Sequence, residues 1–149
     1  MKNNVVQFAF MSLSLVVGGA LEDMLPTVGS LCAPVLLSLA VFFAAETRTP
    51  AWMLAAVAAG AFEEAIHALP PGSAIVFFSA IAVAVHVFRA PAVWIAFAYP
   101  AYQVWLALVA DGAGGAAGRI LLSIPVGAVC LFAAFAALPR LWRKAGADA

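Results

Sequence analysis

The apolar residues of this chain are gathered into blocks long enough to cross a bilayer, and short polar breaks separate them. Apolar residues make up 66% of the 149 positions, whereas Asp, Glu, Lys and Arg together make up 9%. A soluble domain has charges on about a quarter of its residues. Because so few charges cannot cover a water-facing surface, we expect lipid to surround most of the protein.

A helix needs about 20 mostly apolar residues to cross a bilayer. Dividing the chain at its polar and Pro/Gly breaks gives six candidate spans, which are residues 5–21, 27–45, 51–69, 74–88, 91–110 and 120–138. The fourth is short, which fits a tilted or re-entrant helix. We therefore predict an all-α, polytopic membrane protein with six transmembrane helices, forming a single membrane domain over residues 1–149.

The basic residues predict the orientation of these spans, since Lys and Arg near span ends favour the cytoplasm. With six spans, one side of the membrane carries Lys2, Arg48, Arg89, Arg140, Arg143 and Lys144. The opposite side carries Arg119 together with Glu22, Asp23 and Asp111. We expect a multi-pass protein of the bacterial inner membrane with both termini in the cytoplasm.

The first apolar block also resembles a secretory signal, because Lys2 precedes it and the small residues Gly18, Gly19 and Ala20 end it. Its apolar stretch is long and its basic region holds a single lysine, so a retained first helix is favoured over cleavage. The zero net charge argues against nucleic-acid binding, which needs a basic face. Cys32 and Cys130 lie inside apolar blocks and are expected to behave as small hydrophobes.

Two kinds of residue suggest how the helices pack. Small residues four apart let neighbouring helices approach closely, and the third block carries Ala55, Ala56, Ala59 and Gly60. This packing is either internal to the protein or forms an interface with another membrane protein. Proline inside a helix removes a hydrogen bond and favours a kink, and kinks are predicted at Pro34, Pro100 and Pro125.

The polar cluster with most chemical potential is Glu63, Glu64 and His67, near the outer end of the third block. On a helix, His67 can meet either carboxylate, at a spacing of three or four residues. One interpretation is structural or a contact with a partner. A second is half of a di-metal site, but such bundles need the Glu-x-x-His motif twice, and the sequence has it once. A third is a general base, as in glutamic intramembrane proteases, although Ala68 stands where that family has arginine.

We favour the structural interpretation and expect neither catalytic residues nor a cofactor or metal. A second polar patch contains Gln103, flanked by Tyr99 and Tyr102. Buried amides and phenols need hydrogen-bond partners. This patch therefore either links helices or lines a ligand pocket.

The chain also carries a series of turn and small-residue features in its first half. In chain order these are Leu25-Pro26, Gly29, Pro34, the turn Arg48-Thr49-Pro50, Gly60, Glu64 and Pro71-Gly72. Over residues 22–89 this series resembles the rod shape-determining protein MreD family, with Glu64 at a position where that family typically has aspartate.

The resemblance implies a non-enzymatic scaffold of the cell-shape and peptidoglycan elongation machinery. Its implied partners are MreC-like proteins and the peptidoglycan-synthesising pair of RodA and a penicillin-binding protein. The family fold is similar to the substrate-binding subunits of energy-coupling-factor vitamin transporters, so such a subunit is the alternative function. That alternative predicts a ligand cavity near Glu64, Tyr99, Tyr102 and Gln103.

Overall fold

The computed structural model describes residues 2–27, 31–89, 91–111 and 116–144. Over these residues it contains six α-helices, one short π-helical segment and no β-strand, which confirms the all-helical prediction. The elements are α1 (Lys2–Met24), α2 (Val35–Glu46), α3 (Ala51–His67), α4 (Ser73–Phe88), α5 (Pro91–Leu106), η1 (Ala107–Asp111) and α6 (Ala116–Lys144).

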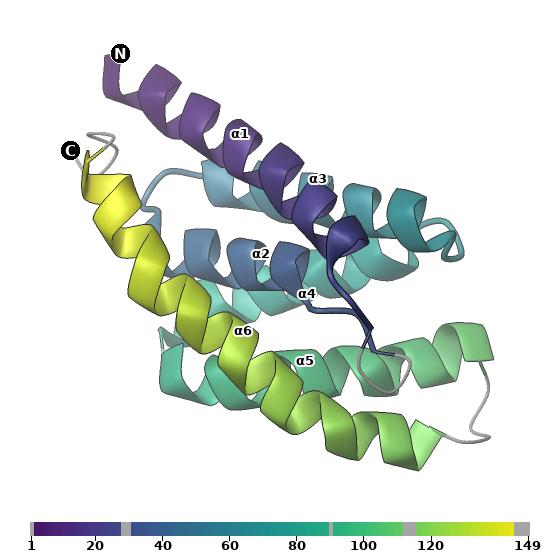
Figure 1. Ribbon diagram of the computed structural model, residues 1–149. Helices are drawn as coiled ribbons and strands as arrows, with labels where there is room; N and C mark the ends of the chain where they lie inside the picture. The colour runs from purple at the N-terminus through teal and green to yellow at the C-terminus, as the bar shows by residue number, and fades with distance from the viewer. Residues whose placement is uncertain (1, 28–30, 90, 112–115, 145–149) are drawn as a thin grey trace.

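Helix α2 forms the centre of the molecule, and the other five α-helices pack around it (Figure 1). Every residue from Leu36 to Ala44 is buried. A helix that is hydrophobic on all sides is stable only when it is enclosed. The core therefore surrounds α2, with aromatic contacts such as Phe42 against Phe135 of α6.

The start of α2 differs from the sequence prediction. The helix begins at Val35 rather than near residue 27, and Pro34 immediately precedes it. Proline is well tolerated at a helix start, where its missing N–H leaves no hydrogen bond unmade. The predicted kink at Pro34 is therefore wrong, whereas Pro100 and Pro125 do lie inside α5 and α6.

Two of the described helices, α1 and α6, are long and apolar enough to cross a membrane. Only 28% of the apolar stretch of α1 and 17% of that of α6 is buried within the protein. The core helices of a soluble protein would be mostly buried, so these two have large apolar faces that need another covering. The remaining α-helices are shorter, with 12 to 17 residues.

Close backbone contacts hold the outer helices together in pairs. Ala55, Ala56, Ala59 and Gly60 are all buried on α3. A Cβ atom added to Gly60 would lie 2.6 Å from the Ile75 Cα of α4. Likewise, a Cβ atom on Gly127 of α6 would lie 2.5 Å from the Tyr99 Cβ of α5. These glycines let the paired helices approach more closely than side chains would allow.

The molecule has two chemically different ends. The start of α1, the end of α6 and the connection between α2 and α3 lie at one end, on the left of Figure 1. Two contacts place the same elements together at this end. The Thr49 hydroxyl donates to Gln7 Oε1 of α1 at 3.3 Å, and His86 Nδ1 of α4 lies 3.0 Å from the Ala44 oxygen of α2. We call this the basic end, after its exposed residues Arg48, Arg89, Arg140, Arg143 and Lys144. The opposite, acidic end holds Glu22, Asp23, Glu63 and Glu64.

Candidate functional site

Three titratable side chains meet at the acidic end. Glu22 lies in the last turn of α1, and Glu63 and His67 lie one turn apart on α3. His67 Nε2 is 3.7 Å from Glu22 Oε1 and 3.9 Å from Glu63 Oε1. We call these three residues the carboxylate–histidine cluster.

Both carboxylates of the cluster are enclosed by the protein. Glu22 is 3% exposed and Glu63 is 5% exposed, whereas the His67 side chain is 23% exposed. The backbone N–H of Leu36 donates to Glu22 Oε2 at 2.8 Å. That N–H belongs to the first turn of α2, which has no partner for it within the helix. Glu22 therefore satisfies the N-terminus of α2 from a different helix.

Helix α5 adds a polar contact to the cluster. The Tyr102 hydroxyl donates to Glu63 Oε1 at 3.1 Å, and the Tyr99 hydroxyl donates to the Cys32 carbonyl oxygen at 2.7 Å. Cys32 in turn places its Sγ atom 3.9 Å from His67 Nδ1. The structure thus joins the Glu63–His67 cluster and the Tyr99–Gln103 patch, which the sequence suggested as separate sites. Tyr102 and Glu63 are 39 positions apart in the chain. Gln103 is also buried.

Glu64 takes no part in the cluster. Its two carboxylate oxygens accept hydrogen bonds from the backbone N–H groups of Gly72 and Ile75, both at 2.9 Å. These amides begin α4, where a negative charge also interacts favourably with the helix dipole. Glu63 and Glu64 therefore do not form the adjacent pair that a general-base mechanism on these two residues requires.

The sequence by itself does not predict Glu22 and Cys32 as members of this site. Glu22 follows the first apolar block, which ends at residue 21, whereas α1 continues to Met24. A signal was present in the spacing of the buried positions of α1. Met11, Leu15, Gly18 and Glu22 are all buried and follow one another at intervals of four, three and four, which is the pattern of one helix face.

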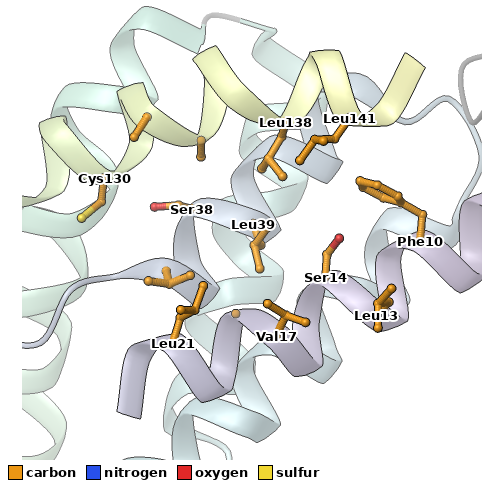
Figure 2. Close-up of a pocket in the computed structure, with 14 residues that line it drawn as sticks. Phe10, Leu13, Ser14, Val17, Leu21, Ser38, Leu39, Cys130, Leu138 and Leu141 are labelled. Carbon is orange, nitrogen blue, oxygen red and sulfur yellow. The ribbon is translucent and has the colours of Figure 1, made fainter. Parts of the chain in front are cut away.

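An apolar groove lies between α1, α2 and α6 (Figure 2). Helices α1 and α6 meet near the basic end, where the rings of Phe10 and Trp142 are 5.3 Å apart, and diverge towards the acidic end (Figure 1). The groove has a volume of about 470 Å³. Its lining is aliphatic and aromatic apart from Ser14, Ser38 and Cys130.

A smaller groove of about 230 Å³ lies between α1 and α3. Neither of these two grooves is lined by Tyr99, Tyr102, Gln103 or Glu64. The hydroxyls of both tyrosines and the carboxylate of Glu64 instead bond to neighbouring protein groups. Tyr102 thus links α5 to α3, and Tyr99 links α5 to the segment that precedes α2.

No family model, curated protein or solved structure matches this chain.

Proposed function

We propose that this protein is a multi-pass scaffold of the bacterial inner membrane that binds the transmembrane helices of partner proteins. The groove between α1 and α6 is the observation that carries this proposal. Both bordering helices have large apolar faces outside the core, so lipid or another apolar helix must cover them. Membrane helices associate by close packing rather than by escape from water, and a groove offers more packing surface than a convex helix face.

The distribution of charge supports six crossings with both termini in the cytoplasm. The exposed arginines and the lysine of the basic end gather beside both chain termini, as the preference of basic residues for the cytoplasm requires. The acidic end then faces the opposite side of the membrane. Large exposed apolar side chains lie on α1, α3, α4, α5 and α6, so the apolar exterior extends around the bundle.

The short length of α2 is compatible with a crossing. Its 12 residues span about 18 Å of the 30 Å hydrocarbon layer, and the non-helical residues 31–34 continue from its N-terminal end. Non-helical backbone is tolerated at membrane depth where protein encloses it. Leu31 and Pro34 of this segment are buried.

The partners follow from the MreD resemblance, which points to MreC-like proteins and the RodA and penicillin-binding-protein pair. The scaffold acts without catalysis in cell-shape control and peptidoglycan synthesis. Partner helices dock in the groove between α1 and α6.

Co-purification from native membranes in mild detergent tests this proposal. Ala134 lines the groove and Val129 lies exposed on the same helix outside it. We expect Ala134→Trp to fill the groove and lower recovery of the elongation partners about tenfold or more. Val129→Trp should leave recovery unchanged. Recovery of no cell-shape protein with the wild type, or equal recovery with both variants, would contradict docking at this groove.

A further inference from the structure

We propose that the carboxylate–histidine cluster binds a divalent transition-metal ion of the zinc class. The ligands are His67 Nε2, Glu22 Oε1 and the Glu63 carboxylate, whose Oε1 also accepts the Tyr102 hydroxyl and whose Oε2 has no hydrogen-bond partner. One imidazole and two carboxylates form a donor set that suits zinc, a borderline-soft ion, better than magnesium or calcium, which prefer oxygen alone. This site goes beyond the scaffold function and departs from the expectation, from sequence, that the protein holds no metal.

The spacing of the ligand atoms fits an ion at their centre. One ligand atom from each residue lies within 4.8 Å of the others. His67 Nε2 is 3.7 Å from Glu22 Oε1 and 3.9 Å from Glu63 Oε1, which is too long for a direct N–H···O hydrogen bond. Ligands about 2.1 Å from a tetrahedral zinc ion are about 3.4 Å apart. The two His67 separations exceed this value by about 0.3 and 0.5 Å, so the side chains would move closer on binding, and a water molecule would supply the fourth ligand of a tetrahedral site.

Two buried atoms of the cluster lack a hydrogen-bond partner. With both carboxylates ionised, neither Glu63 Oε2 nor His67 Nε2 has a hydrogen-bond partner among the described residues, and both atoms are inaccessible to solvent. Leaving such groups unpaired destabilises the folded state. A single cation would satisfy both atoms, and two carboxylates would neutralise its double charge.

The groups around the ligands hold them in a suitable orientation. Metal-binding carboxylates and histidines are usually fixed by hydrogen bonds from an outer layer of residues. The Leu36 N–H holds Glu22 Oε2, and the Tyr102 hydroxyl holds Glu63 Oε1. Cys32 Sγ lies beside His67 Nδ1. A proton on Nδ1, directed at this sulfur, leaves Nε2 with the lone pair that a metal needs.

An ion can reach the cluster from the acidic end. The His67 side chain is 23% exposed, and α3 ends at this residue, so the imidazole lies at the boundary of the buried site. Asp23, adjacent to Glu22, is exposed at the same end. Negative charge at the entrance raises the local concentration of cations.

Metal binding to the full-length protein in detergent tests the site directly. The protein is stripped with a chelator and titrated with Zn²⁺ against a competing indicator, and Co²⁺ is used as a spectroscopic probe. We expect about one ion per chain and visible Co²⁺ absorption typical of a low-coordinate nitrogen–oxygen site. Absence of stoichiometric Zn²⁺ binding, or stoichiometric binding of Mg²⁺ or Ca²⁺ in preference to Zn²⁺, would overturn the proposal.

Substitutions locate the ion. Glu22→Gln, Glu63→Gln and His67→Asn should each weaken Zn²⁺ binding about 100-fold, and Tyr102→Phe about tenfold. Glu46→Gln, at an exposed position at the basic end of the molecule and remote from the cluster, is the matched control and should bind Zn²⁺ as the wild type does. If a ligand variant fails to fold, Tyr102→Phe and the wild-type Co²⁺ spectrum decide the question. Wild-type affinity in both His67→Asn and Tyr102→Phe would overturn the assignment.

Discussion

Glu63 and Glu64 are neighbours in the chain but act in different parts of the structure. Consecutive residues on a helix point about 100° apart, so the two carboxylates cannot share one set of partners. Glu63 faces α1 and α5, where it meets His67 and Tyr102. Glu64 faces the start of α4. One carboxylate thus belongs to the candidate metal site and the other to the helix cap.

Replacement of Glu64 should weaken the fold rather than ion binding. Glu64→Ala removes both acceptors of the Gly72 and Ile75 amides, and we expect a loss of about 2 kcal/mol in the free energy of unfolding. Thermal or denaturant unfolding in detergent measures this effect. Glu46→Ala, at an exposed position at the basic end, is the control and should change stability little. Equal stability of the two variants would show that the cap is energetically unimportant.

The members of the polar site could be predicted from sequence only in part. Helical spacing predicts that Glu63 and His67 share a face, and they do. The same spacing left open which carboxylate His67 would meet, because that depends on which helices lie beside α3. Glu22, Cys32 and Tyr102 join the site through tertiary packing. The spacing of residues within one helix does not predict contacts between helices.

At the level of helices, hydropathy located the elements better than it located their ends. The prediction of residues 51–69 corresponds to α3 at Ala51–His67, and that of 74–88 to α4 at Ser73–Phe88. The second block failed at its start, since α2 begins at Val35. An apolar run alone does not distinguish a helix from buried non-helical backbone. Pro34 marks the start of α2 and not the predicted kink within a longer helix.

The contact between α3 and α4 gives a sharp test of packing. Gly60→Ala places a Cβ atom 2.6 Å from the Ile75 Cα, a backbone atom that cannot move alone. We expect the two helices to separate, at a cost of about 2 kcal/mol or more.

Gly118→Ala is the matched control for this substitution. A Cβ atom at Gly118, which lies on α6, would meet nothing within 4 Å. It should be neutral or stabilise the protein by up to about 1 kcal/mol, because alanine favours helix. Unfolding measured in the same detergent should therefore show a clear loss of stability for Gly60→Ala and none for Gly118→Ala. Similar shifts would argue that α3 and α4 are not in this close contact.

On the scale of the whole molecule, the separation of charges between the two ends predicts how the protein lies in the membrane. Labelling with a membrane-impermeant maleimide in intact cells tests this, in a background with Cys32→Ala and Cys130→Ala. Thr27 and Arg48 are exposed at the acidic and basic ends respectively. We expect Thr27→Cys to react from outside and Arg48→Cys to react only after the membrane is opened. The reverse pattern would invert the topology, and labelling of both from outside would contradict the six crossings.

The bond between Glu22 and the Leu36 amide has a mechanical consequence. It connects the last turn of α1 to the first turn of α2, between residues 14 positions apart in the chain. A shift of α1 along its axis by one turn, about 5.4 Å, would leave the Leu36 amide and the Glu22 carboxylate buried without a hydrogen-bond partner. The hydrogen bond therefore fixes the axial register of α1 relative to α2. A shift of either helix along its axis costs free energy that apolar contacts alone would not impose.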